Sequence, residues 1–304
     1  MKRIISVFFV LAAAFTAVAQ SQTADRYIQR YNLLVSQFGP AGVGVETVLD
    51  NWAKVDSTSA DYLFARFSYN FTKAQTAEVI SRTDKKYLGM DPVISLKDSL
   101  GNDVHYYQVN MFDDELYGKA MRFIDKAVSV YPDRLDFRFV KANAYIAYEK
   151  ESPDMALAYL LELSGKEKER PWFYEGEKIE DGFYEEAMQE YCYSLYSIGS
   201  PAALDAFHAL SQKLASIYPD HLDFLNNIGS YHMLAKEDYK AAIKQYGKVL
   251  KKDPSNYTAI KNCVLASRKM GNVKSEKKYL QMLLEHGSEK DKLVAQGRLD
   301  QLSK

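Results

Sequence analysis

The sequence has few of the residues that cross-link or interrupt a chain. Its 304 residues include 2 cysteines, 8 prolines and 15 glycines. Few prolines and glycines leave long stretches free to form helices. Cys192 and Cys263 each lie within an apolar helical pattern, where a thiol packs as a small hydrophobic group. We expect two buried, unpaired thiols, and a disulfide between them is the alternative, because an exported protein can oxidise its cysteines.

An excess of charge of one sign is also lacking. The chain has 39 basic and 40 acidic residues, whereas a nucleic-acid-binding protein has a strong basic excess. The 5 histidines do not form a metal-ligand spacing, and neither a nucleophile turn nor a phosphate-binding loop is found. The sequence therefore predicts no nucleic acid partner, no cofactor, no metal and no enzymatic activity.

The first twenty residues differ from the rest. Lys2 and Arg3 precede an apolar run from Ile4 to Phe15, and Ala17-Val18-Ala19 has the pattern of a cleavage site. These features indicate a secretory signal peptide over residues 1–19, cleaved after Ala19. A retained membrane anchor is the alternative, but the apolar run is short for a bilayer core of roughly 30 Å. Because no lipoprotein cysteine follows, we expect a periplasmic or extracellular protein with no integral membrane segment after cleavage.

The rest of the chain contains an internal repeat. The segment Tyr131–Phe137 recurs at Tyr218–Phe224 with one difference, and Pro254 follows Pro219 by 35 residues. Because proline fits the first turn of a helix but breaks its interior, each proline predicts the start of a new helix nearby. Residues 222–254 show a whole unit, in which two stripes of apolar spacing three and four flank the polar turn 236–238.

This pattern resembles the tetratricopeptide repeat family, whose unit is a helix–turn–helix of 34 residues. The matching residues are Gly229, Ala242, Tyr246 and Pro254, then Gly271, Leu280 and Leu283, and earlier Ala120, Ala127, Pro132 and Ala142. The match is strong over 113–164 and 220–286, weaker over 181–219 and weakest over 24–73, where one more helix pair is expected. The resemblance implies an all-α solenoid of antiparallel helix pairs over residues 20–304, similar to exported tetratricopeptide proteins of Bacteroidetes-type bacteria.

Two segments depart from the helical pattern. In residues 91–110, two β-rich runs flank Gly101-Asn102, which predicts a β-hairpin insertion. It either caps an exposed helix edge or serves as a binding appendage. In residues 164–181, charged and glycine residues surround Trp172, which predicts a solvated loop with an aromatic anchor. Beyond Gly287, residues 289–302 predict a closing helix that shields the last repeat.

The first helices of such repeats line a concave face where peptides bind. In each first helix, one small residue packs against the neighbouring helix. The residues three positions before it, one position after it and four positions after it point in similar directions. Applied to Ala142, Gly229 and Val264, these offsets select candidates for a partner-binding groove. They are Phe139, Asn143, Asn226, Ser230, Met233, Lys261, Leu265 and Arg268. An ordinary solvated face with no ligand is the alternative.

These observations predict a non-enzymatic scaffold of the bacterial cell envelope that binds a protein or peptide of unidentified sequence in its groove. A solute- or glycan-binding accessory of an outer-membrane uptake system is the second hypothesis. Such accessories contain similar helices but are usually lipid-anchored and longer. A clustered aromatic platform in the folded chain would favour this second hypothesis.

Overall fold

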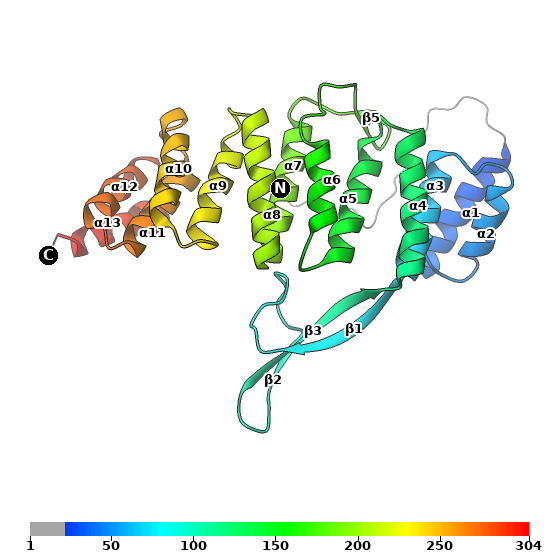
Figure 1. Ribbon diagram of the computed structural model, residues 1–304, viewed down its shortest axis with the longest axis horizontal. Coiled ribbons are helices and arrows are strands. Elements are labelled where there is room, and N and C mark those ends of the chain that lie inside the picture. The colour runs from blue at the N-terminus through cyan, green and yellow to red at the C-terminus, as the bar shows by residue number, and fades with distance from the viewer. Residues whose placement is uncertain (1–21, 304) are drawn as a thin grey trace. The chain divides into compact units, whose positions relative to one another are not determined.

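The structure is a computed structural model that describes residues 22–303, and the expected signal peptide lies outside the described residues. Within them the chain forms thirteen α-helices and a small antiparallel sheet (Figure 1). Contacts divide the chain into two compact units. Unit 1 contains the described residues up to 150 together with 166–184, and unit 2 contains 151–165 and the residues from 185 onward. The helical repeat fold is therefore confirmed.

Unit 1 has a core built largely from aromatic rings. Its helices are α1 (Gln22–Phe38), α2 (Val45–Ala53), α3 (Ala60–Lys73), α4 (Asp114–Val130) and α5 (Leu135–Glu149). Trp52 on α2 is 1% exposed and lies edge-on to Tyr62 of α3, with ring centroids 5.7 Å apart. Phe71 stacks on Phe67 at 5.2 Å. The expected N-terminal helix pair of residues 24–73 is thus three helices, because α3 pairs with α4 across the insertion.

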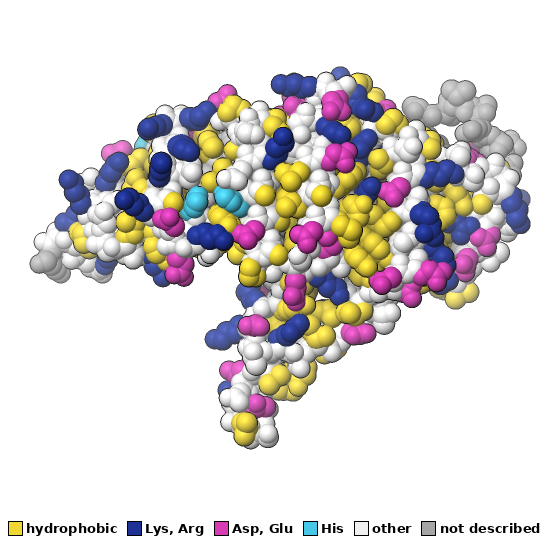
Figure 2. Space-filling view, viewed as in Figure 1, with side chains coloured by type: hydrophobic (Ala, Val, Ile, Leu, Met, Phe, Trp, Pro, Cys, Tyr) yellow, Lys and Arg dark blue, Asp and Glu magenta, His cyan; other side chains and the backbone are white. Residues whose placement is uncertain are grey.

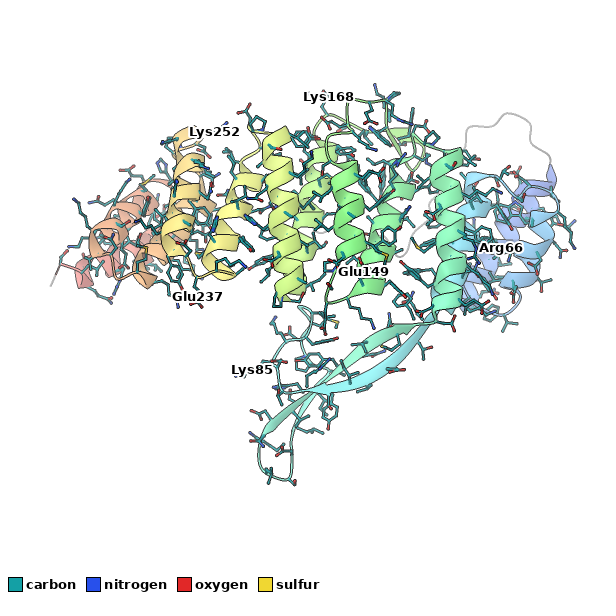
Figure 3. The ribbon with its side chains drawn as sticks, in the orientation of Figure 1. Arg66, Lys85, Glu149, Lys168, Glu237 and Lys252 are labelled. Atoms are coloured by element: carbon teal, nitrogen blue, oxygen red, sulfur yellow. The ribbon has the colours of Figure 1, made fainter. Side chains whose placement is uncertain are left out.

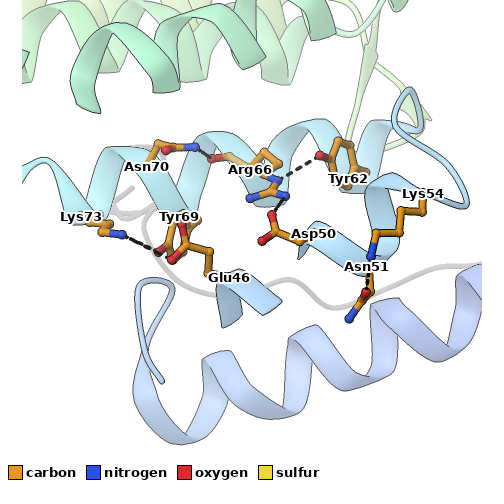
Figure 4. Close-up of polar contacts among 9 residues, drawn as sticks. All are labelled: Glu46, Asp50, Asn51, Lys54, Tyr62, Arg66, Tyr69, Asn70 and Lys73. Carbon is orange, nitrogen blue, oxygen red and sulfur yellow. Dashed lines mark hydrogen bonds and ion pairs between the residues drawn. The ribbon is translucent and has the colours of Figure 1, made fainter. Parts of the chain in front are cut away.

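Polar contacts at the edge of this core join α2 to α3 (Figure 4). The guanidinium of Arg66 bonds the Asp50 carboxylate, and its Nε donates to the Tyr62 hydroxyl at 3.0 Å. Lys73 donates to the Tyr69 hydroxyl at 2.8 Å and lies 3.5 Å from Glu46. The carboxylates of both ion pairs are exposed, and such pairs stabilise weakly. The aromatic packing therefore determines how the two helices lie.

The insertion between α3 and α4 is larger than the predicted hairpin of residues 91–110. The strands are β1 (Gln75–Arg82), β2 (Ile94–Lys97) and β3 (Asp103–Phe112), in the order β1-β3-β2. The predicted hairpin is confirmed as β2 and β3, but β1, which pairs with β3 along eight residues, was missed. In Figure 1 the sheet extends away from the ends of α3 and α4.

One face of the sheet is covered by the segment that joins β1 to β2. His105, Tyr107 and Val109 are buried on this face. The Tyr107 hydroxyl donates to the backbone carbonyl of Asp84, and the Tyr87 ring lies 5.7 Å from the Tyr107 ring. Lys85 lies on the same covering segment (Figure 3). The opposite face stays open, and apolar side chains are visible on the sheet in Figure 2.

The predicted loop around Trp172 packs on α5. Two short strands, β4 (Phe173–Tyr174) and β5 (Glu177–Lys178), form a small hairpin within it. Trp172 is 2% exposed, and its indole N–H donates to the carbonyl of Lys166 at 3.0 Å. The Arg138 guanidinium lies 5.2 Å from the indole centroid. The aromatic anchor is therefore confirmed, and it fixes the segment 166–184 to unit 1.

Unit 2 contains the regular repeats. Its helices are α6 (Asp154–Leu163), most of α7 (Phe183–Ile198), α8 (Pro201–Ile217), α9 (Leu222–Leu234), α10 (Tyr239–Lys252), α11 (Tyr257–Lys269), α12 (Val273–His286) and α13 (Glu289–Gln301). Asp238, Asn256 and Asn272 cap α10, α11 and α12 by accepting a backbone N–H three residues later. In both units, α5, α9 and α11 begin three residues after Pro132, Pro219 and Pro254, as the prolines predicted.

The two cysteines lie in the interior of unit 2. Both are free and buried, which confirms the expectation of unpaired thiols. Burial raises the pKa of each thiol to about 12. At neutral pH both therefore stay protonated and pack as small apolar groups.

The helices of the pair α9 and α10 approach most closely at a glycine. A Cβ added at Gly229 would lie 2.6–2.8 Å from ring carbons of Tyr246, which is fully buried. The missing side chain thus leaves the space that the tyrosine ring fills. By contrast, a Cβ added at Gly247 on α10 would meet no atom within 4 Å.

We expect Gly229→Ala to lower the free energy of unfolding by about 1–3 kcal/mol, because the ring must move and overpacked cores lose this much. Gly247→Ala is the matched control and should stabilise by up to about 1 kcal/mol through helix propensity. Urea unfolding followed by circular dichroism measures both. Equal stability of the two variants would contradict the close contact.

The closing helix predicted for residues 289–302 is confirmed as α13, and a buried carboxylate joins it to the preceding pair. Glu276 on α12 is 2% exposed. Arg298 of α13 and Arg268 of α11 each donate from Nε to its Oε1 at 2.9 Å. The hydrogen bonds from Arg298 lower the pKa of Glu276 most, and those from Arg268 lower it further. Together they hold the pKa below its ordinary value, although burial raises it.

Because the folded pKa is lowered, this carboxylate stabilises the fold at neutral pH, and the contribution is lost as pH falls through the folded pKa. We expect Glu276→Gln to lower the thermal midpoint at pH 7 by about 2–4 °C. The difference from the wild type should shrink as the pH falls below the ordinary pKa of a glutamate and through the lowered pKa of Glu276. Thermal scans across this pH range test it, and a difference that does not vary with pH would contradict the ion pair.

Candidate functional site

A row of polar and aromatic side chains crosses three helices of unit 2. On each helix its members are three, four or seven residues apart, so they lie on one helical face. We call this row the tyrosine–amide surface. It consists of Gln189, Tyr193 and Tyr196 on α7, Asn227 and Ser230 on α9, and Asn262 and Leu265 on α11.

Two amides join the first two helices of this surface. Asn227 donates from Nδ2 to Gln189 Oε1 at 2.8 Å, and Gln189 donates from Nε2 to Asn227 Oδ1 at 3.4 Å. Both side chains are half-buried. A reciprocal amide pair of this kind uses one donor and one acceptor of each group. The Asn227 side chain also hydrogen-bonds the Cys192 thiol. Gln189 therefore keeps a further N–H and a further lone pair for another molecule.

The Tyr246 hydroxyl joins the second and third helices. It accepts a hydrogen bond from Nδ2 of Asn262 at 3.0 Å and lies 3.1 Å from Oγ of Ser230. Burial raises the pKa of Tyr246 to about 12, so the hydroxyl keeps its proton and can donate to the serine. The ring that spaces α9 from α10 thus also fixes the polar side chains of α9 and α11.

Two tyrosines and a leucine supply the exposed apolar area. Tyr193 is 56% exposed, Tyr196 is 36% exposed and Leu265 is 41% exposed. The Tyr193 and Tyr196 ring centroids lie 6.4 Å apart, and Tyr196 packs on Phe207 of α8 at 5.5 Å. Tyr196 is therefore held by the fold, while a large part of both rings faces solvent.

The residues predicted for the groove on α9 are mostly inside the protein. Asn226 is 3% exposed and donates to Asn256 Oδ1 at 3.2 Å, and Met233 is 6% exposed within the apolar core. Ser230 belongs to the tyrosine–amide surface. The residues of α9 on this surface, Asn227 and Ser230, are half-buried and lie two before and one after Gly229, so the surface is rotated from the predicted face.

On α11 the same rotation separates the predicted residues. Leu265 is on the tyrosine–amide surface, but Lys261 and Arg268 are directed to later helices. Lys261 lies 3.7 Å from Asp291 of α13, and Arg268 bonds Glu276 of α12. On α11 the residues three before and four after the small residue therefore each contact a later helix, although both remain exposed. That these residues bind a partner stays a prediction.

The two predicted residues on α5 belong to unit 1. The Phe139 ring is 6% exposed and lies 6.3 Å from the ring of Tyr174 in the segment 166–184. Asn143 is half-buried. The chain itself therefore occupies the face of α5 around Phe139. The loop prediction named Trp172 and its neighbours but gave no sign that they would cover this helix.

The residues of α7 were missed by sequence reasoning. Gln189, Tyr193 and Tyr196 lie four and three residues apart, a spacing that places them on one face. The repeat match is weak over 181–219, however, so no small packing residue marked which face of α7 is open. A search for exposed tyrosines at this spacing would have found them.

Two further features of residues 22–303 concern other kinds of site. Among these residues, no three or more His, Cys, Asp or Glu side chains are grouped so that they could hold a metal ion. A search of the described helices found none with the length and apolar character needed to cross a membrane.

Comparison with known proteins supports the repeat character of the chain. The family model of the TT21 fifth ARM repeats domain matches residues 231–296, which include α10, α11 and α12. No curated protein matches the sequence.

Several solved structures are similar over much of the chain. YrrB, described as a TPR protein with an unusual peptide-binding site, is 17% identical, with a TM-score of 0.35 over 78% of this chain and 90% of its own. PilW, a type IV pilus biogenesis factor, is 11% identical, with a TM-score of 0.36 over 90% of this chain and 99% of its own. Yeast Tom70 is 12% identical, with a TM-score of 0.38 over 92% of this chain and 47% of its own. These scores are low, so the description of the fold rests on the helix pairing seen in this chain.

Proposed function

We propose that this protein is a non-enzymatic scaffold that binds an extended peptide segment of another protein through the tyrosine–amide surface. The observation that supports this most is the chemistry of the row across α7, α9 and α11. Gln189 keeps an unused donor and acceptor, and Tyr193, Tyr196 and Leu265 expose apolar area on the same surface. An extended peptide needs both, because its backbone requires hydrogen bonds and its side chains require apolar contacts.

The energetics favour tyrosine as the anchor of such a site. Tyrosine buries a large rigid ring at low entropic cost and keeps a hydroxyl for hydrogen bonding, which is why it is frequent at binding hot spots. Tyr196 is already packed on Phe207 and loses little freedom when a partner covers it. Tyr193, the more exposed of the two, supplies the larger area for burial.

The test is affinity capture from a cell-envelope extract with the whole chain as bait. We expect Tyr193→Ala/Leu265→Ala to reduce capture of a specific protein at least about tenfold, since hot-spot residues cost more than about 1 kcal/mol each when truncated. Quantitative mass spectrometry of the captured proteins measures the loss.

The matched control is Leu293→Ala/Val294→Ala on α13. These residues are 78% and 60% exposed and belong to the same unit but not to the tyrosine–amide surface. Capture should be unchanged. Equal capture by wild type and both double variants would reject the surface as the binding site.

A second function is favoured by one observation. The neighbouring rings of Tyr193 and Tyr196 form a small exposed aromatic platform with amides beside it, which is also suited to the face of a sugar ring. A glycan array probed with the wild type and with Tyr193→Ala separates the two hypotheses. Binding of a defined glycan that the variant loses would support a glycan-binding accessory protein.

We also propose that the protein is exported to the periplasm or the cell exterior, in the manner of a bacterial envelope protein. The support is the sequence of residues 1–19. N-terminal sequencing of the protein purified from its native cells should give Gln20 as the first residue. A first residue of Met1, or recovery of the protein only from the cytoplasm, would overturn this proposal.

A further inference from the structure

The outer edge of β1 is unpaired over most of its length. The strand order β1-β3-β2 leaves β1 at the edge of the sheet. Within residues 22–303, no hydrogen bond from outside the ladder reaches the backbone of residues 77–81. The residues from Thr76 to Val79 and Ser81 are exposed. An edge of this kind is a template on which a further strand can pair.

The residues that face this edge follow from the ladder. The Asp113 N–H donates to the Ala74 carbonyl at 2.8 Å, and in the register of β1 with β3 these two residues are partners. Hydrogen-bonded and non-hydrogen-bonded pairs alternate in an antiparallel ladder. The even-numbered residues of 76–82 therefore bond to β3, and residues 77, 79 and 81 direct their N–H and C=O groups outward.

The side chains of β1 add a charge pattern that complements itself. Glu78 and Arg82 lie four residues apart on the same face, with Ile80 midway between them. Both are exposed, and the Arg82 guanidinium also lies 5.1 Å from the ring centroid of Tyr87 in the covering segment. When two copies of this strand run antiparallel around a two-fold axis at Ile80, Glu78 of each lies opposite Arg82 of the other. In the same register Val79 of each copy forms a hydrogen-bonded pair with Ser81 of the other. The outward-directed backbone groups thus meet in the register that also pairs the charges.

Other registers lose this agreement. Centring the axis on Glu78 or Arg82 places like charges opposite one another, which destabilises a cross-strand pair. Centring it on Val79 pairs Glu78 with Ile80 and Arg82 with Thr76. The partner that satisfies the edge, the charges and the symmetry together is a second copy of this chain, and a two-fold dimer is also the commonest form of homo-oligomer.

We propose that β1 is a homodimerisation strand, which pairs antiparallel with β1 of a second copy around Ile80 and is held in register by two Glu78–Arg82 ion pairs. The two three-stranded sheets then form one continuous six-stranded sheet. This interface uses backbone hydrogen bonds and leaves the side chains of the tyrosine–amide surface uninvolved.

Charge reversal tests the register. The wild-type chain should sediment as a dimer in analytical ultracentrifugation. Glu78→Arg and Arg82→Glu should each weaken dimerisation about tenfold or more, because each replaces two attractive cross-strand pairs with two repulsive ones. The double variant Glu78→Arg/Arg82→Glu should dimerise like the wild type.

An equimolar mixture of the two single variants supplies the matched control. One variant has positive charges at both positions and the other has negative charges at both, so the mixture should form a heterodimer. This outcome separates loss of the interface from misfolding, which mixing would not repair. A wild-type chain that is monomeric at high micromolar concentration would overturn the proposal. Failure of both the double variant and the mixture to dimerise would also overturn it. In either case the proposal stays overturned even if an extended peptide of another protein pairs with β1.

A cysteine cross-link tests the axis directly. Non-hydrogen-bonded antiparallel partners have Cα atoms about 4.5 Å apart, within the range that a disulfide spans. Ile80→Cys should therefore form an intermolecular disulfide under mild oxidation, visible on a non-reducing gel. Val79→Cys is the control on the same strand, and it should cross-link much less because its partner is Ser81. Cys192 and Cys263 are buried and should not compete.

Discussion

The close approach of paired helices at a residue without a side chain is the constraint on which the rest of unit 2 depends. At Gly229 the backbone of α9 leaves space that the Tyr246 ring fills. The position of this ring has two consequences. It sets the spacing of α9 and α10, and it brings the Tyr246 hydroxyl to Ser230 and Asn262. The packing of the pair and the placement of the polar surface are therefore one structural feature.

The sequence predicted the parts of the fold that depend on local periodicity. Apolar residues three and four apart indicate helices whatever their neighbours, so α9 to α13 follow from their spacing and from the turns that contain Pro219, Pro254 and Gly271. Which side chains of a helix stay exposed depends on more than this spacing. Asn226 is buried and donates to Asn256 at the start of α11, whereas Arg268 is exposed and also bonds Glu276 of α12. That difference depends on how successive pairs cross, which side-chain packing decides.

The strand β1 illustrates a different limit. Its sequence, Gln75 to Arg82, has no apolar alternation, and most of its residues are exposed. Nothing local distinguishes it from a polar loop. It is a strand because β3, whose His105, Tyr107 and Val109 are buried, offers it a ladder. Strand formation at an edge therefore reflects tertiary context more than the strand's own composition, and β2 with β3 was recognisable only because a turn lies between them.

The two surfaces proposed here select partners by different physical means. On the tyrosine–amide surface the side chains are positioned by the helices, and selection depends on which partner covers the rings and satisfies the amides. At β1 the backbone provides the hydrogen bonds, which any extended chain can accept, so selection depends on Glu78 and Arg82. Each of these charges lies opposite a charge of the other sign when an identical strand runs antiparallel around Ile80. The two charged residues of the exposed edge therefore also define the partner that pairs with β1 in register.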